Sequence, residues 1–162
     1  MLVSNTSTLV LLAKVGCLEE FIEIAPTIEI PIQVKREALF EKGSYYSILI
    51  QKLIQDKKIK IVNVDKVDVI KVMSQFNLDE GEAATFIMFK EKRHNAILTD
   101  DGELIKLCKL EKIPFASAMA VVIRMFETKK LSKEKTMELL ENLHNIGRYS
   151  EKLYEYFKRE VK

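Results

Sequence analysis

The stretch LVSNTSTLVLLAKVG, residues 2–16, joins a short apolar run to a longer apolar segment through one polar turn. Residues 2–4 have the length and composition of a buried strand, and the run after Asn5 has those of a core helix. A strand followed directly by a helix is the repeating unit of α/β folds. The stretch therefore predicts an α/β protein, and it raises the question of why an asparagine stands at the turn.

The same alternation continues along the chain. The expected strands lie at residues 2–4, 27–30, 59–62, 96–99 and 114–116. The expected helices between and after them lie at about 31–41, 45–56, 66–75, 79–92, 102–109 and 118–128. Two further helices without strands follow, at about 133–145 and 150–159. This order predicts a parallel sheet with helices on both faces. We expect one domain over residues 1–130 and a C-terminal helical extension, residues 131–162, packed on it.

Composition limits the classes of function. The chain has 162 residues, 48% of them hydrophobic, which is enough for the core of one domain. Its formal charge is +2, so attraction to a polyanion must come from local clusters of charge. Cys17 and Cys108 lack the spacing of metal ligands and suit a reducing cytoplasm. Because apolar runs long enough to span a bilayer are lacking, we expect no contact with a membrane.

Polar residues that directly follow strands are the first candidates for a site, because ligands of such sheets bind beyond the carboxyl ends of the strands. Asn5 follows the first expected strand, and Asp100 and Asp101 follow the fourth. If these strands are neighbours, the three side chains share one crevice. Two acids on helices join them as candidates: Glu37, which borders an apolar helix surface, and Glu82, in the first turn of its helix.

Each acid also has a purely structural interpretation. Asp79 and Glu82 have the spacing of a capping box, Asp100 and Asp101 precede a glycine as in a plain turn, and Glu37 fits a solvated helix face. Four carboxylates in one crevice, however, would repel one another unless a cation neutralised them. Mg²⁺ or Mn²⁺ prefers such an all-oxygen site and supports hydrolysis of phosphodiesters.

Three segments in order carry a family resemblance: VSNTSTLVLLAKVG, then IPIQVKREAL, then LDEGEAATFIMFKEKRHNAILTDDGELIKLCKL. They resemble PIN domains, particularly the prokaryotic and archaeal PIN proteins related to the VapC toxins. The resemblance implies a three-layer α/β/α sandwich with a small parallel sheet. It also implies a cytoplasmic ribonuclease that depends on Mg²⁺ or Mn²⁺, and a toxin that a small antitoxin holds in check.

The resemblance also implies roles for single residues. The metal ligands would be Asn5, Glu82 and Asp101, with Glu37 and Asp100 positioning water or a second ion, so that the catalytic acids are Glu37, Glu82, Asp100 and Asp101. The hydroxyls of Thr6, Ser7 and Thr99 would orient water or ligands. Asn5 departs from the family's aspartate: its amide oxygen can coordinate a cation, but it brings no charge and cannot act as a base.

Two functions are therefore open. The first is a metal-dependent endoribonuclease acting on single-stranded or structured RNA, with Lys90, Lys92 and Arg93 as the best basic cluster for holding phosphates. The second is a catalytically weakened PIN homologue that binds RNA or a protein. The apolar stripes of the two C-terminal helices would cover the domain's own core, with a homodimer or antitoxin groove as the alternative.

Overall fold

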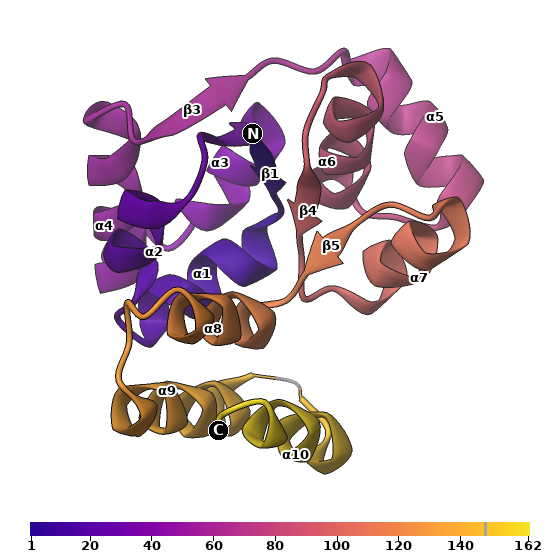
Figure 1. Ribbon diagram of the computed structural model, residues 1–162. Coiled ribbons are helices and arrows are strands. Elements are labelled where there is room, and N and C mark those ends of the chain that lie inside the picture. The colour runs from indigo at the N-terminus through magenta and orange to yellow at the C-terminus, as the bar shows by residue number, and fades with distance from the viewer. Residues whose placement is uncertain (148) are drawn as a thin grey trace.

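The computed structural model describes residues 1–147 and 149–162 (Figure 1). Its elements are β1 (Leu2–Ser4), α1 (Thr6–Lys14), α2 (Leu18–Ile24), β2 (Ile28–Pro31), α3 (Ile32–Ala38), α4 (Tyr45–Gln55), β3 (Ile59–Val62), α5 (Lys66–Phe76), α6 (Glu80–Glu91), β4 (Ala96–Leu98), α7 (Gly102–Glu111), β5 (Phe115–Ala116), α8 (Ala118–Glu127), α9 (Lys133–Ile146) and α10 (Glu151–Arg159).

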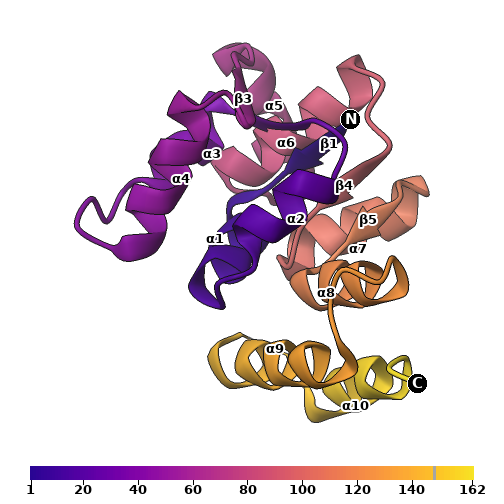
Figure 2. The ribbon, with the colours of Figure 1, turned by 60° about the vertical axis from the view of Figure 1, so that its left-hand side comes forward.

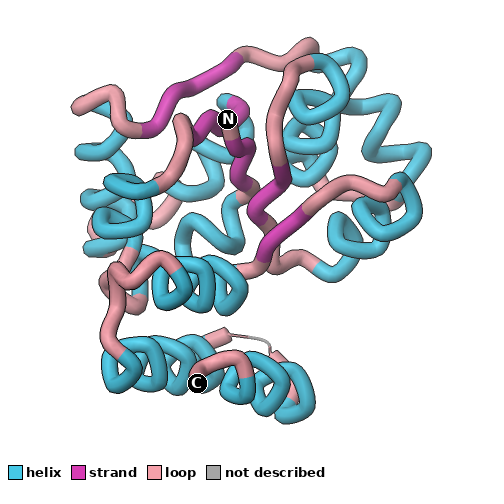
Figure 3. The backbone as a smooth tube through the Cα atoms, viewed as in Figure 1, coloured by secondary structure: helices cyan, strands magenta, loops and turns pink. Residues whose placement is uncertain are grey.

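The strands form one parallel sheet in the order β3-β2-β1-β4-β5 (Figure 3). β1 lies in the middle and pairs with β2 on one side and with β4 on the other, where Ser4 stands opposite Leu98. Parallel neighbours need a crossover connection, and helices supply it here. The expected parallel α/β sheet is confirmed, with strand boundaries within a residue or two of those expected.

The side chains of the strands divide the core into two parts, because successive residues point to opposite faces. Ile28 and Ile30 of β2 belong to a cluster that includes residues of α1, α2, α4 and α8. Val3 of β1 and Ile97 of β4 belong to a second cluster with residues of α5, α6 and α7. Figure 1 shows these last three helices together on one side of the sheet. The expected three-layer α/β/α sandwich is thus confirmed.

Two helices differ from the expectation. α2 falls where no element was expected, since its buried residues Leu18 and Phe21 make an apolar pattern too short to stand out. α3 was expected to run to about residue 41, but it ends at Ala38. Phe40 is 84% exposed, so a further turn would have no core surface to pack against.

The last two helices form an antiparallel hairpin that lies beyond α8 in both views (Figures 1 and 2). Leu139, Leu140 and Leu143 of α9 are fully buried in the cluster that includes α8. α10 packs back on α9, where the rings of His144 and Tyr154 stack with their centroids 4.1 Å apart. This shared core supports our proposal that residues 131–162 are an extension of one domain. Among the described residues, no helix is long and apolar enough to cross a membrane.

Candidate active site

A cavity of about 590 Å³ opens where β1 and β4 end. Its lining includes Thr6, Ser7, Glu37, Asp100 and Asp101. β1 is followed in sequence by β2 on one side of the sheet, whereas its other neighbour, β4, comes much later in the chain. Such a change of direction in the strand order is where ligands of open α/β sheets bind. The cavity therefore lies where this fold places a functional site.

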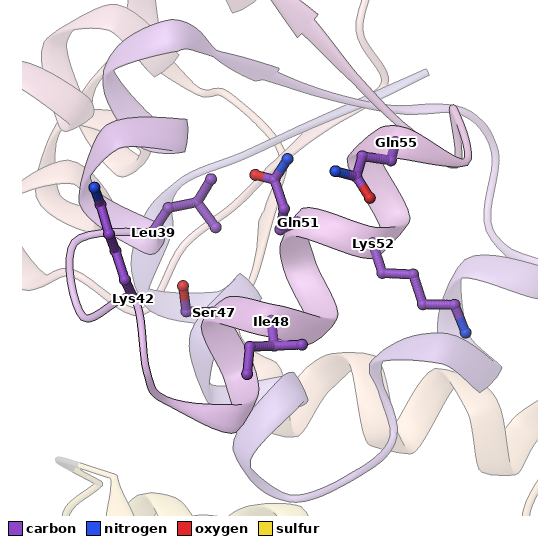
Figure 4. Close-up of a pocket in the computed structure, with 7 residues that line it drawn as sticks. All are labelled: Leu39, Lys42, Ser47, Ile48, Gln51, Lys52 and Gln55. Atoms are coloured by element: carbon purple, nitrogen blue, oxygen red, sulfur yellow. The ribbon is translucent and has the colours of Figure 1, made fainter.

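A second cavity, of about 410 Å³, lies against α4 (Figure 4). Its polar lining consists of Lys42, Gln51, Lys52 and Gln55, together with the hydroxyl of Ser47. These side chains are amides, cations and a hydroxyl. Three of the candidate acids, Glu37, Asp100 and Asp101, line the first cavity, whereas Asn5 and Glu82 are not part of its lining.

Asn5 and Asp101 meet at the ends of the paired strands β1 and β4. The backbone N–H of Asn5 donates to the carbonyl oxygen of Leu98 at 2.8 Å, and its side-chain Nδ2 donates to Oδ2 of Asp101. Both residues stand at helix N-cap positions, where Asn and Asp usually accept a hydrogen bond from their own first turn. Neither side chain makes that bond here. The two side chains thus bond to each other within the site instead of capping their own helices.

The other side-chain atom of Asn5 is the best indication of a ligand. Asn5 is 1% exposed, and its Oδ1 has no hydrogen-bond partner within residues 1–147 and 149–162. The orientation of the amide follows from the neighbouring carboxylate, which accepts a hydrogen bond and so faces the nitrogen. A buried acceptor without a partner carries a desolvation cost. A coordinated cation would remove it.

Glu82 belongs to a complete capping box. The N–H of Glu82 donates to Oδ1 of Asp79 at 2.8 Å, and the N–H of Asp79 donates to Oε2 of Glu82 at 3.1 Å. Burial raises the pKa of Glu82 to about 7, and the negative charges of Asp79 and Asp101 contribute to the rise. The structural interpretation and a functional one are therefore compatible, because the capping acid also lies within the acidic site.

Glu37 reaches the same site from α3. Oε2 of Glu37 accepts a hydrogen bond from the hydroxyl of Thr6 at 3.1 Å. A Cβ atom at Gly81 would lie 2.9 Å from Cδ of Glu37, so the glycine leaves the space that this carboxylate occupies. Burial raises the pKa of Glu37 to about 6, with contributions from the charges of Asp79 and Asp101. Glu37, Glu82 and Asp101 thus form one electrostatic cluster.

Asp100 is held by protein donors. Its Oδ1 accepts from the hydroxyl of Thr8 at 2.5 Å and from the N–H of Ala118 at 2.9 Å, and its Oδ2 accepts from the hydroxyl of Tyr149. Burial raises the pKa of Asp100, and these hydrogen bonds oppose the rise. Asp100 therefore fastens α1, α8 and the C-terminal hairpin together. A role in positioning water or an ion stays a prediction.

Tyr149 is the functional-site residue that the sequence did not indicate. It lies 49 residues from Asp100, beyond the end of an expected helix, and a lone tyrosine there carries no signal. Gly147 allows the Tyr149 ring to pack closely against the end of α9. A Cβ atom at residue 147 would lie 2.7 Å from the carbonyl oxygen of Leu143 and 2.7 Å from Cε2 of Tyr149. Burial raises the pKa of Tyr149 beyond its usual value, so that its hydroxyl is a neutral donor.

The predicted hydroxyls orient the acids. Ser7 Oγ accepts from the N–H of Asp100 at 2.9 Å, and Thr99 Oγ1 accepts from the N–H of Asp101 at 3.1 Å. Through these bonds the two hydroxyls set the backbone of the turn that carries both aspartates.

The predicted basic cluster of Lys90, Lys92 and Arg93 lies elsewhere. It precedes β4 and therefore stands at the amino ends of the strands, opposite the acids. Lys90 pairs with Glu111 at 3.7 Å, and Lys92 pairs with Glu29 at 3.8 Å. The structure does not bring this cluster into the cavity, and its contact with RNA stays a prediction.

The donors present suit a hard divalent cation. Within residues 1–147 and 149–162, no three His, Cys, Asp or Glu side chains converge closely enough to make a metal site alone. Mg²⁺ needs only one or two carboxylates, because water and substrate phosphate complete its coordination. The predicted ligands Asn5, Glu82 and Asp101 would supply oxygen atoms alone, and Oδ1 of Asn5 has no other partner among the described residues.

The raised pKa values predict that the metal-free protein loses stability as pH rises. An unfolded glutamate titrates near 4.5, whereas Glu37 titrates near 6 and Glu82 near 7 in the fold. Between these values the folded state binds more protons, so the free energy of unfolding falls with increasing pH. In EDTA, we expect the melting temperature to fall across this range. Glu37→Gln should lessen the fall, and an equal slope in both proteins would contradict this account.

Comparison with known proteins agrees with the fold. The family model DUF3368, described as a PIN domain, matches residues 1–162. The chain is similar to the crystal structure of PAE2754 from Pyrobaculum aerophilum, with a TM-score of 0.56 and 16% identity over 78% of this chain and 89% of that chain. That similarity shows the fold. No curated protein matches the chain significantly.

The family match confirms the resemblance drawn from the sequence, whereas the closer relation to VapC toxins stays a prediction. PIN domains are typically nucleases and generally use divalent metal ions. The central acids stand where the two halves of the sheet meet, and the family model covers the hairpin as well as the sheet. The chain therefore belongs to the DUF3368 family of PIN domains.

Proposed function

We propose that this protein is a Mg²⁺- or Mn²⁺-dependent endoribonuclease that hydrolyses phosphodiester bonds of single-stranded or structured RNA. The observation that carries the proposal is the electrostatic cluster of Glu37, Glu82 and Asp101 together with the buried, unpartnered Oδ1 of Asn5, whose Nδ2 donates to Asp101 at the carboxyl ends of β1 and β4. Burying such a cluster is costly unless a cation shares it. Perturbed carboxyls in a cavity are typical of catalytic sites.

The residues that would hold the ion are Asn5, Glu82 and Asp101. A bound Mg²⁺ or Mn²⁺ would supply an activated water and stabilise the charge that develops on the phosphate. α1 and α7 begin directly after Asn5 and Asp101, and neither helix has its first turn capped by these side chains. The positive ends of two helix dipoles therefore border the site, where they favour an anionic phosphate.

Glu37 is the residue best suited to accept a proton from the attacking water. A general base works best when its pKa lies near the working pH, and the pKa of Glu37 is about 6. The hydroxyl of Thr6 donates to one of its oxygens and holds the carboxylate in place. Gly81 keeps the space for it free.

Cleavage of a pooled single-stranded RNA tests the proposal. The wild type should cut RNA in Mg²⁺ or Mn²⁺ and stop in EDTA. Asp101→Asn should cut at least about a hundredfold more slowly, because it removes a charged ligand and is otherwise similar in shape. Glu103→Gln, an exposed change two residues along in α7, is the matched control and should cut like the wild type. Equal activity of the wild type and Asp101→Asn would overturn the proposal.

One observation favours a second candidate, a weakened homologue that binds RNA or a protein. The Nδ2 of Asn5 donates to Oδ2 of Asp101. This carboxylate oxygen therefore already has a neutral partner, which could take the place of a metal ion. Under this candidate the wild type would show no cleavage with any metal.

Further parts of the proposal rest on the resemblance. These are a toxin role, a small antitoxin partner and a homodimer. Cys17 and Cys108 are buried free thiols, which supports placing the activity in the reducing cytoplasm.

A further inference from the structure

We propose that the apolar part of the catalytic cavity binds the nucleobase next to the scissile phosphate, and that the α9–α10 hairpin forms one wall of this base groove. The inference rests on the proposed ribonuclease function and names the part of the substrate that the site holds. The cavity of about 590 Å³ lies within the range of volumes that suits small ligands. Glu37, Asp100 and Asp101 lie beside Thr6 and Ser7, and the rest of the lining mixes apolar side chains with Lys14, Glu41 and Ser117.

The floor of the base groove is the outward stripe of α1. Ser7, Val10, Leu11 and Lys14 all line the cavity and follow one another at helical spacing. Ser7 lies beside the aspartates, whereas Lys14 lies about 10 Å further along the helix axis. The floor thus runs from the acidic end, over two apolar residues, to a cation.

The two walls come from distant parts of the chain. Phe40 and Tyr46 contribute from the end of α3 and from α4, and Ile146 and Leu153 contribute from the hairpin. Phe40 is 84% exposed, Ile146 50% and Leu153 39%. Large apolar groups gathered and exposed around one cavity mark a binding surface rather than a core. Aromatic rings and aliphatic side chains that line one cavity suit a flat ring such as a base.

The hairpin wall is fixed before any ligand arrives. Tyr149, between α9 and α10, donates its hydroxyl to Asp100 at the acidic end of the same cavity. Asp100 also accepts hydrogen bonds from the hydroxyl of Thr8 in α1 and from the N–H of Ala118 in α8. The spacing between floor and wall is therefore set by hydrogen bonds, and a preorganised groove loses less entropy on binding.

The charges favour an RNA whose phosphates lie at the two ends of the groove. Lys14 Nζ lies 5.0 Å from the centre of the Tyr46 ring, and the hydroxyl of Tyr46 donates to Glu41 at 2.8 Å. Glu37 and Asp101 repel a phosphate unless a divalent cation is present. The neutral base then occupies the apolar part, and the next phosphate reaches Lys14. We therefore expect RNA binding to require the metal, whereas a basic peptide would bind without it.

Fluorescence of short single-stranded RNA containing 2-aminopurine tests the inference. The titrations use the full chain in the cold, in millimolar Mn²⁺ or in EDTA, with RNA integrity checked on a gel. The wild type should quench the fluorophore in Mn²⁺ and not in EDTA. Phe40→Ala and Leu153→Ala should each weaken binding at least about fivefold and lessen the quenching, because they remove stacking surface. Unchanged melting temperatures would show that both variants fold.

Leu110→Ala is the matched control, since Leu110 is a 74% exposed apolar residue of α7 that does not line the cavity. It should bind like the wild type. Equal binding by wild type, Phe40→Ala and Leu153→Ala would overturn the base groove, even if all three cut RNA. RNA that fails to bind while hexa-arginine binds in EDTA would also overturn it and point to a peptide. Groove-dependent binding without cleavage would uphold the groove and overturn the nuclease.

Discussion

Asn5→Asp is expected to accelerate metal-dependent RNA cleavage at least about tenfold. Mutation of residues that only hydrogen-bond to metal ligands already changes metal affinity or activity by such factors. The substitution adds a negative charge beside Asp101 and replaces the amide whose Nδ2 now bonds to that carboxylate. An aspartate there ligates a cation more strongly than an amide oxygen does. Cleavage rates in a titration of Mg²⁺ and Mn²⁺ measure the effect, and the metal concentration at half-maximal rate should fall.

The same substitution should destabilise the protein when metal is removed. Two carboxylates would then replace a hydrogen-bonded amide and carboxylate in a buried place, and like charges repel. The melting temperature of Asn5→Asp should therefore lie below that of the wild type in EDTA and rise more on addition of Mn²⁺. Asn63→Asp, the same change at an exposed residue between β3 and α5, should alter neither property. A variant that is as slow as the wild type and insensitive to Mn²⁺ would contradict a metal at Asn5.

Asp100→Ala is expected to lower the free energy of unfolding by about 2 to 4 kcal/mol, since it leaves three donors without their acceptor. These donors are the hydroxyls of Thr8 and Tyr149 and the N–H of Ala118. Urea unfolding measures the loss. Tyr149→Phe removes one of the three hydrogen bonds and should cost about 1 kcal/mol.

The control for this prediction is Asp56→Ala. Asp56 is an exposed aspartate that ends α4, where a negative charge lies at the unfavourable end of the helix dipole. Its removal should leave stability unchanged or slightly increased. If Asp100→Ala unfolds at the same urea concentration as the wild type, the aspartate does not fasten the hairpin to the sheet.

Local patterns were sufficient to predict the fold. The strands are short apolar runs set between longer amphipathic ones, and Asn5 and Asp101 follow strands that pair with each other. The rule that ligands bind at the carboxyl ends of parallel strands then brings these residues to one edge. Glu37 joined them because it borders an apolar helix surface, and Glu82 because it lies in the first turn of its helix.

Contacts between distant side chains were beyond the reach of such patterns. The hydrogen bond of Tyr149 to Asp100 joins residues 49 apart, and the bond of Asn5 to Asp101 joins residues 96 apart. Neither contact can be inferred from the periodicity of one helix or strand.

The direction of α6 explains why the basic cluster lies away from the acids. The helix runs from Glu82 at the acidic edge of the sheet to Lys90, about 12 Å along its axis. The cation and the acid of one helix thus point to opposite edges of the sheet.

The central position of β1 has a consequence for the protein while it is being made. A ribosome delivers Asn5 first, yet the neighbour of β1 on the far side, β4, and the aspartates that follow it arrive only after most of the domain has been synthesised. Tyr149 follows later still. The nascent chain of the proposed nuclease therefore lacks part of the catalytic cluster during most of its own translation, and we expect it not to cleave the messenger that encodes it until β4 has joined the sheet.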